Sequence, residues 1–199
     1  TLKIRTGWCA NDIVAEDIVK MAQNEGIEFV AIHGRTRAQK YNGLANWPLI
    51  NDIAGKYEIP IIGNGDLHSS VFVKKELKKT NCKALMLGRG PLRFPFIFLE
   101  SMTEEPVDFF PSDHMEIIKR LHGYMCDYFD HPKFIEIQLK KHILWMSAGY
   151  PGAKAFRRLL FELRGHEQVV NYACKYLDEI GDIQKNINLQ EPFLSGGEG

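Results

Sequence analysis

The chain has 199 residues, 45% of them hydrophobic, and its 25 Lys and Arg residues balance its 25 Asp and Glu residues. This size suits one or two globular domains, and the balanced charge gives no argument for a nucleic-acid partner unless basic residues gather locally. No apolar run approaches the ~20 residues that span a membrane. The cysteines, at positions 9, 82, 126 and 174, form no CxxC pair, which argues against a zinc site or disulfides and favours a reducing, cytoplasmic setting.

Four short apolar runs, at residues 2–4, 28–32, 59–63 and 83–88, recur along the first half of the chain. Their spacing of about 25 to 31 residues is the length of one strand–loop–helix–loop unit. Each run is apolar throughout rather than alternately, which is typical of parallel strands covered on both faces. The runs therefore predict four parallel strands.

Helical patterns separate and follow these strands. Residues 12–25 predict a helix that ends before Gly26, and a second helix is expected from Ser69 or Ser70 to Leu77. Residues 91–100 predict a shorter one. No further strand pattern follows, and helical periodicity over residues 112–184, broken at 131–133 and 149–152, predicts a bundle of about four helices.

Repeated β/α units of this kind fit either an open doubly wound sheet or a (β/α)8 barrel. Four units make half a barrel, which would leave two unpaired strand edges. Either another segment supplies the other half, or the sheet is open. We divide the chain into an α/β part at 1–106, an all-α part at 107–190 and a tail at 191–199.

In both architectures ligands bind at the carboxyl ends of the strands. Glycine-rich turns follow the last two predicted strands, as GNGD and GRG, where backbone N–H groups can approach an anion closely. Tight turns alone would explain either one, but together with charged residues at the other strand ends they suggest a site for a phosphorylated cofactor with an electron-rich ring, such as a flavin. The strand-end residues are Lys3, Arg5, His33, Gly34, Arg35, Gly63, Asn64, Gly65, Asp66, Gly88, Arg89 and Gly90.

Simpler interpretations exist for the individual residues. Lys3 would ordinarily be an edge lysine that reaches solvent, and His33 a core histidine with its hydrogen bonds satisfied. Cys9 follows the first strand near the same edge, but no base adjoins it, so we expect a small buried side chain and not a nucleophile.

A local excess of positive charge marks the helical part. Residues 133–164 contain seven Lys and Arg residues against two Glu residues. Charges on a helix are usually explained by a solvated face. Because this excess occurs within a neutral chain, a surface that binds a polyanion is an equally good interpretation. The basic residues are Lys133, Lys140, Lys141, Lys154, Arg157, Arg158 and Arg164.

These segments together resemble the tRNA-dihydrouridine synthases, which are flavin enzymes with an FMN-binding (β/α)8 barrel and a C-terminal helical domain. The resemblance covers about residues 1–165: LKIRTGW is similar to the fifth barrel strand, and AIHGRTRAQKYNGLANW carries the family's most recognisable motif. IPIIGNGD and LMLGRGPLRFPFIF resemble the seventh and eighth strands, and KKHILWMSAGYPGAKAFRRLLFEL the helical domain of the bacterial branch.

The resemblance implies a role for each matching position. Lys3 and His33 would contact the FMN ring region, and Asn64, Gly65, Asp66, Gly88 and Arg89 would hold its phosphate end. Arg35 and Arg37 would lie near an RNA-facing mouth. Residues on the basic helices would contact the tRNA backbone, namely Lys140, Lys141, Lys154, Arg157 and Arg158.

The implied reaction is the reduction of uridine in tRNA to 5,6-dihydrouridine, with FMN as cofactor and NADPH as reductant, by a protein that is a monomer at full length. The family's catalytic cysteine belongs to the first half of the barrel, so we expect this chain, which begins directly in a strand, to be a fragment without a catalytic residue or a metal, inactive alone. Two alternatives remain: an FMN-dependent barrel that acts on a small molecule, and an RNA-binding helical bundle without enzymatic activity.

Overall fold

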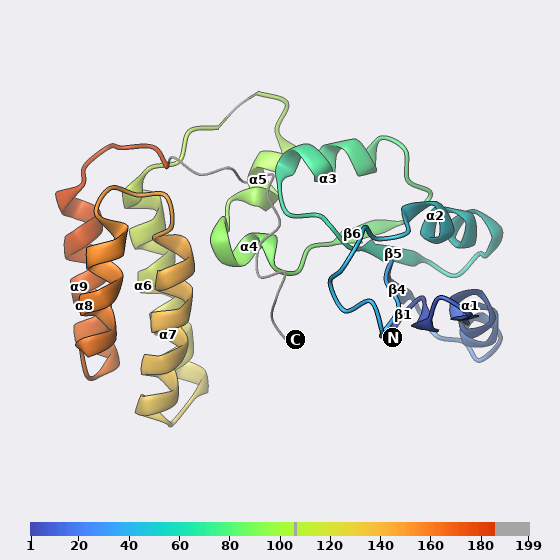
Figure 1. Ribbon diagram of the computed structural model, residues 1–199, viewed down its shortest axis with the longest axis horizontal. Helices are drawn as coiled ribbons and strands as arrows, with labels where there is room; N and C mark the ends of the chain where they lie inside the picture. Colours follow the sequence, from blue (N-terminus) through green and yellow to red (C-terminus); the bar gives the residue numbers. More distant parts are fainter. Residues whose placement is uncertain (106, 186–199) are drawn as a thin grey trace. The chain divides into compact units, whose positions relative to one another are not determined.

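The computed structural model describes residues 1–105 and 107–185, which form two compact units (Figure 1). Among the described residues, the α/β unit contains Thr1–Pro91 and Ile97–Glu104, and the helical unit contains Leu92–Phe96, Glu105 and residues 107–185. The predicted tail at 191–199 lies outside the described residues. None of the described helices combines the length and apolarity needed to cross a membrane.

The α/β unit is built on a four-stranded sheet with the order β1-β4-β5-β6. All three neighbouring pairs are parallel, which confirms the four predicted strands and places their carboxyl ends at one edge. The strands are β1 Leu2–Arg5, β4 Val30–His33, β5 Ile61–Asn64 and β6 Ala84–Met86.

Helices cover the sheet unequally. Helix α1, Ala15–Asn24, packs on β1 and β4, and α2, Trp47–Lys56, packs on β5. On the face that carries Lys3, by contrast, Lys3 and Ala84 are exposed and Ile62 is only half-buried. The continuously apolar strands led us to expect that both faces of the sheet are covered. Among the described residues, α1 and α2 pack on one face, and Lys3, Ile62 and Ala84 on the other face are not fully buried.

A short antiparallel ribbon precedes α1 and was not predicted. Strand β2, Gly7–Cys9, pairs with β3, Asp12–Ile13, so the helix expected from residue 12 begins only at Ala15. The carbonyl of Thr6 accepts the N–H groups of Val14 and Ala15, at 3.0 and 3.1 Å, which holds the chain in this turn. The predicted end of the helix is confirmed, since Gly26 has the positive φ of 72° that suits a glycine there.

Two other predicted helices differ in detail. Helix α3, Ser70–Leu77, begins after Ser69 as expected, but the Ser69 hydroxyl makes no capping hydrogen bond and is buried without a partner. The helix predicted at 91–100 is split into α4, Gly90–Arg93, and α5, Ile97–Met102. Pro95 falls in the break, because proline lacks the N–H that a helix needs and disfavours helical geometry in the residue before it.

The helical unit contains the four helices that the sequence predicted within its described residues. They are α6 Pro111–Tyr128, α7 Pro132–Met146, α8 Ala153–Glu162 and α9 His166–Glu179. Both predicted breaks occur, the second at Gly152 with its left-handed φ of 69°. Helix α9 packs against the other three around fully buried Leu139, Leu160 and Val169.

A buried ion pair holds the middle of this unit together. The Lys140 ammonium, on α7, donates to Glu136 Oε1 at 2.8 Å and to the carbonyl of Leu163 at 2.6 Å, and both side chains are almost completely buried. Glu136 Oε2 accepts the backbone N–H of Gly165 at 2.9 Å. Hydrogen bonds from Lys140, Lys133 and Gly165 lower the pKa of Glu136 to about 2. One carboxylate therefore fixes the turn between α8 and α9.

We expect Glu136→Gln to lower the free energy of unfolding by about 3 kcal/mol, because it leaves the buried Lys140 ammonium without its counter-charge. Chemical denaturation measures this loss. Glu179→Gln is the matched control, since Glu179 pairs with Lys175 at an exposed position and its loss costs about 0.5 kcal/mol or less. Equal effects of the two substitutions would contradict the structural role of Glu136.

Candidate functional site

A cavity of about 680 Å³ lies at the carboxyl edge of the sheet. Pockets for small molecules and cofactors commonly measure ~300–1,000 Å³. The parallel register aligns Arg5, His33, Asn64 and Met86 in one row across the strands, and all four line the cavity. The seven residues predicted to bind a cofactor all line it as well, namely Lys3, His33, Asn64, Gly65, Asp66, Gly88 and Arg89.

An ion pair joins the two loops that follow β4 and β5. Arg35 Nη2 donates to Asp66 Oδ1 at 2.6 Å and to the carbonyl of Gly43 at 2.6 Å. The other carboxylate oxygen of Asp66 accepts the N–H of Ala45 at 2.7 Å. The Asp66 carboxylate is thus occupied within the protein, so its contribution to an anion site is to shape the turn, where its own φ is +57°.

Trp47, which follows the HGRTR motif at the start of α2, stabilises the same turn. Trp47 Nε1 donates to the carbonyl of Gly65 at 3.1 Å, and the indole covers Gly63 so closely that a Cβ there would lie 2.5 Å from the ring. A Cβ at Gly65 would lie 2.5 Å from that of Ala45, and its φ of +131° also disfavours other residues. Both glycines therefore allow the two loops to pack together.

His33 is buried at the centre of the cavity row. Burial lowers its pKa to about 4, and the positive charges of Arg5, Arg35 and Lys3 add to this effect. The imidazole is therefore neutral near pH 7 and offers one donor and one acceptor nitrogen.

Two arginines flank Tyr41 beside His33. The Arg89 guanidinium lies 3.9 Å from the centre of the Tyr41 ring, and that of Arg5 lies 5.9 Å from it. Arg5 also donates to the carbonyls of Thr36 and Lys40, at 2.8 and 3.0 Å, which tethers the loop. Sequence reasoning placed Arg5 at the strand end but gave it no binding role, and it missed Tyr41, whose neighbours come from opposite edges of the sheet.

The positive charge of the cavity exceeds its negative charge. Lys3, Arg5, Arg35 and Arg89 contribute four cationic side chains against the single carboxylate of Asp66. Lys3 is exposed, and no hydrogen bond or ion pair of its ammonium is found among the described residues. The arrangement favours an anionic ligand.

Two residues predicted to contact RNA need correction. Arg35, expected near an RNA-facing mouth, is 3% exposed and serves the ion pair with Asp66. Lys140, expected on a surface, is 5% exposed and occupied by Glu136 and two carbonyls. Neighbouring helix positions differ by ~100° around the axis, so Lys140 points into the bundle whereas Lys141 reaches the surface.

The other predicted RNA-contact residues remain accessible. Arg37 is exposed in the loop after β4, and Lys141, Lys154 and Arg158 are exposed on or beside α7 and α8. Arg157 is half-buried and its Nε donates to the carbonyl of Ala153 at 3.1 Å.

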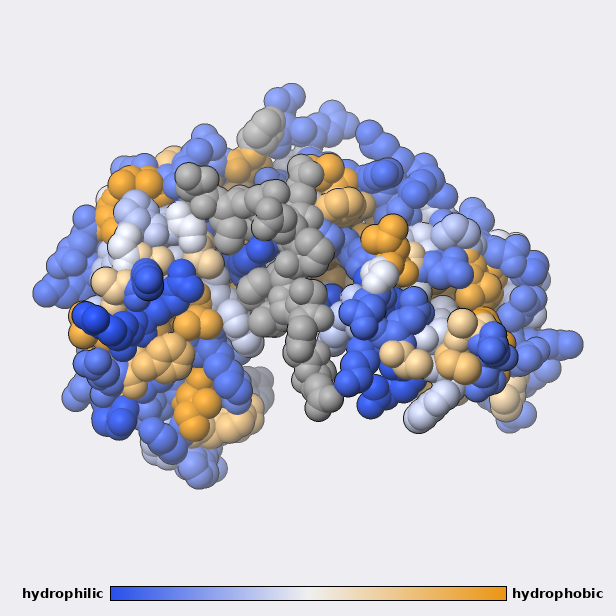
Figure 2. Space-filling model, in the orientation of Figure 1, coloured by the Kyte–Doolittle hydropathy of each residue, from blue (hydrophilic) through white to orange (hydrophobic). Residues whose placement is uncertain are grey.

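The visible surface of the helical unit mixes hydrophilic and hydrophobic residues and has no continuous apolar face (Figure 2).

A parallel sheet with an electropositive cavity at its carboxyl edge, followed by a helical bundle, defines an α/β protein with a site suited to an anionic cofactor. The particular family follows from comparison with known proteins. Residues 1–188 match the dihydrouridine synthase (Dus) family, and the chain belongs to it.

Similar proteins include a probable tRNA-dihydrouridine synthase of Rickettsia prowazekii, 34% identical over 165 residues, which cover 79% of this chain and 49% of that protein. The tRNA-dihydrouridine synthase B of Vibrio cholerae is 31% identical over 189 residues, covering 90% of this chain and 57% of its own length. The tRNA-dihydrouridine synthase B of Pseudomonas aeruginosa is 34% identical over 161 residues, which cover 79% of this chain and 48% of that protein. The chain thus spans about half the length of the curated relatives it matches.

The lowered pKa of His33 predicts a pH dependence of stability. As pH falls below the ordinary value of 6.5, the unfolded chain binds a proton that the folded chain takes up only near pH 4, so this contribution is complete above 6.5 and is lost towards 4. The free energy of unfolding should therefore fall when the pH is lowered from about 7.5 to about 4.5. In His33→Gln this fall should be about 2 kcal/mol smaller than in the unsubstituted chain.

Urea denaturation at the two pH values measures this difference. The unsubstituted chain, measured at the same two pH values, is the control. An unchanged pH dependence in His33→Gln would contradict the assignment of a buried neutral imidazole.

Proposed function

We propose that this chain is part of an enzyme that reduces uridine in tRNA to 5,6-dihydrouridine, with FMN as cofactor and NADPH as reductant. One observation carries the proposal: the HGRTR and GNGD segments interlock to form a cationic cavity at the carboxyl edge of the sheet. Membership of the Dus family supports the same activity.

The residues of the cavity fit a phosphorylated flavin. Arg35 Nη1 is a buried donor without a hydrogen-bond acceptor in the protein, and Arg35 lines the cavity. A Cβ added to Gly88 would meet no atom within 4 Å, so this glycine leaves open space beside the lining. An anionic ligand would supply the acceptor that Arg35 lacks and occupy the space that glycine leaves.

Different residues would hold different parts of the cofactor. Gly65, Asp66, Gly88 and Arg89 belong to the two glycine-rich turns, which suit the phosphate end. Lys3 on β1 and His33 on β4 lie on the strands beside these turns and suit the flavin ring. Asn64 is held by its own hydrogen bond to the Met86 carbonyl, which keeps its amide in the cavity lining.

When bound, FMN supplies the hydride chemistry that saturates the C5–C6 bond of uridine. The residues of this chain contribute orientation and electrostatics. Lys3 would provide a positive charge that stabilises negative charge developing on a carbonyl, and the neutral His33 would donate one hydrogen bond without adding charge. No residue of this chain is assigned as the proton donor to C5, and the base must leave its stack to reach the cavity.

We further propose that the sheet forms the second half of a (β/α)8 barrel whose other half carries the catalytic acid. The partly exposed face that bears Lys3 and Ala84 supports this proposal, because the inner face of such a barrel is filled by side chains from every strand. The exposed cations Arg37, Lys141, Lys154 and Arg158, with the half-buried Arg157, would hold the tRNA phosphates and orient the substrate without reading its bases.

Lys3→Ala in the full-length protein should lower kcat for uridine reduction by about 10- to 100-fold, because a positive charge near the reacting ring is lost. Stability should be unchanged, since Lys3 makes no ion pair within the described residues. Single-turnover kinetics with unmodified tRNA measure the rate. Lys20→Ala, on the exposed side of α1, is the control, and equal rates for both variants would refute the role of Lys3.

Replacing both Lys141 and Arg158 with Glu should weaken tRNA binding by about 10-fold or more and reduce the salt dependence of binding by about one log–log unit for each lost phosphate contact. NADPH oxidation should be spared. A matched charge reversal, Lys119→Glu with Arg120→Glu on α6, should have the smaller effect. A flavin-containing protein without salt-sensitive tRNA affinity would instead favour a small-molecule oxidoreductase.

A further inference from the structure

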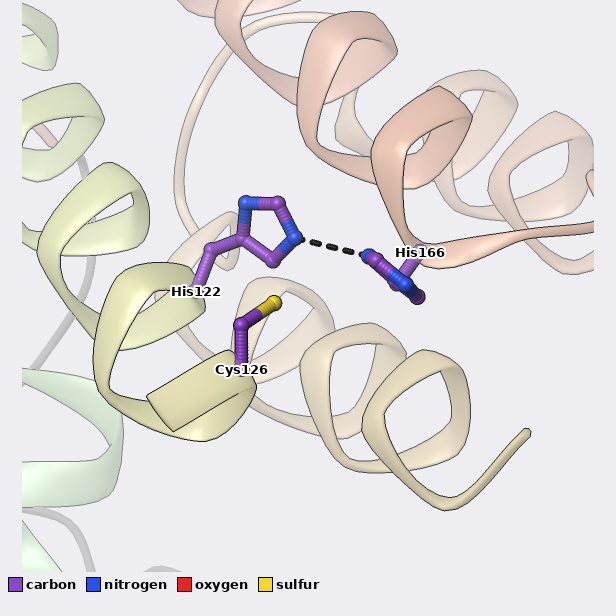
Figure 3. Close-up of side chains that lie close together, drawn as sticks. All are labelled: His122, Cys126 and His166. Carbon is purple, nitrogen blue, oxygen red and sulfur yellow. Dashed lines mark hydrogen bonds between the residues drawn. The ribbon is translucent and has the colours of Figure 1, made fainter. Parts of the chain in front are cut away.

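Three metal-ligating side chains gather in the helical unit, outside the cavity of the α/β unit. Their donor atoms, from His122, Cys126 and His166, all lie within 4.8 Å of one another. Figure 3 shows the two imidazoles facing each other, with the Cys126 sulfur directed to the same space. His122 Nε2 and His166 Nδ1 are 2.8 Å apart in a hydrogen bond.

Local sequence brings these donors together from two helices. His122 and Cys126 are four residues apart on α6, which places both on one face of the helix. His166 is the first residue of α9 and follows Gly165, whose φ is +83°. The Gly165 N–H is held by Glu136, so the buried ion pair of α7 also sets the position of His166.

The kinds of donor decide which ion would bind. Imidazole nitrogen and thiolate sulfur suit zinc and similar transition metals, whereas magnesium and calcium require oxygen ligands. Tetrahedral zinc, with bonds of about 2.0–2.1 Å to nitrogen and about 2.3 Å to sulfur, would separate the two nitrogens by about 3.3 Å and each nitrogen from the sulfur by about 3.6 Å. Both separations fall within the 4.8 Å that encloses the three donor atoms.

The present hydrogen bond between the two histidines uses His122 Nε2 and His166 Nδ1, which are the nitrogens that would bind a metal. One imidazole donates a proton to the other, so metal binding requires the donor ring to move that proton to its second nitrogen. The Cys126 thiol must also lose its proton, to the solvent. Cys126 is exposed and the two histidines are half-buried, which leaves a path for the ion and room for water as a fourth ligand.

We propose that His122, Cys126 and His166 form a zinc site that joins the C-terminal part of α6 to the start of α9. The cysteine spacing alone argued against zinc, because it offers no second cysteine nearby, and the structure supplies two histidines instead. The site would brace the helical unit in which the proposed RNA-contact residues of α7 and α8 lie. It does not depend on that proposed function, because its ligands and its readout involve neither flavin nor tRNA.

Cobalt and zinc ions test the proposal directly on the purified chain. We expect one Co²⁺ per chain with a thiolate-to-cobalt charge-transfer band, and one proton released for each ion bound, because only the thiol loses a proton on net. Zn²⁺ should displace the cobalt and abolish the band. No band, or a band without displacement by Zn²⁺, would overturn the site.

Single substitutions separate the site from adventitious binding. Cys126→Ser should abolish the charge-transfer band, and His166→Gln should weaken Co²⁺ binding at least 10-fold. Cys174→Ser and His142→Ala are the matched controls in the same unit and should bind as the unsubstituted chain does. A band that persists in Cys126→Ser, or disappears in Cys174→Ser, would refute the assignment.

Thermal unfolding gives a second readout that does not rely on cobalt. Because an ion that binds only the folded chain stabilises it, added Zn²⁺ should raise the Tm of the unsubstituted chain and of both controls. The rise should be absent in Cys126→Ser and in His166→Gln. Equal rises in all variants would mean that zinc binds elsewhere and would contradict the proposal.

Discussion

The ion pair between Arg35 and Asp66 is the contact on which the α/β site depends. The Arg35 side chain is 3% exposed, so removing Asp66 would leave a buried, uncompensated charge. Through this pair the loop after β4 is attached to the loop after β5, and Asp66 also holds the backbone of Ala45. Trp47 completes the attachment at Gly65. Residues of a recognisable motif that look like surface charges in the sequence therefore serve first as the framework of the cavity.

The parallel register converts this framework into a chemical environment. It aligns Arg5, His33 and Asn64 across the sheet, so cations from different strands converge on one imidazole. Burial lowers the pKa of His33 to about 4, and these positive charges add to the effect. The same positive charges favour an anionic ligand, so one cavity combines a neutral hydrogen-bond donor with a cationic lining.

In the helical unit, Glu136 has the structural role that the Arg35–Asp66 ion pair has in the α/β unit. It compensates the buried charge of Lys140 and holds the N–H of Gly165, where α9 begins. The positive charge of this unit is consequently divided: Lys140 stabilises the interior, while Lys141 and Arg158 remain at the surface. Since His166 follows Gly165 directly, the same carboxylate supports the proposed zinc site.

The sequence by itself determined the four parallel strands, the four helices of the described bundle and the edge of the sheet at which the cavity lies. Apolar runs, glycines and prolines act over a few residues, and parallel strands necessarily end at one edge. Only the tertiary structure decided that Lys140 is buried, that Tyr41 lies between two arginines, and that His166 meets His122, 44 residues away. These contacts depend on register and helix packing between distant segments, about which local periodicity carries no information.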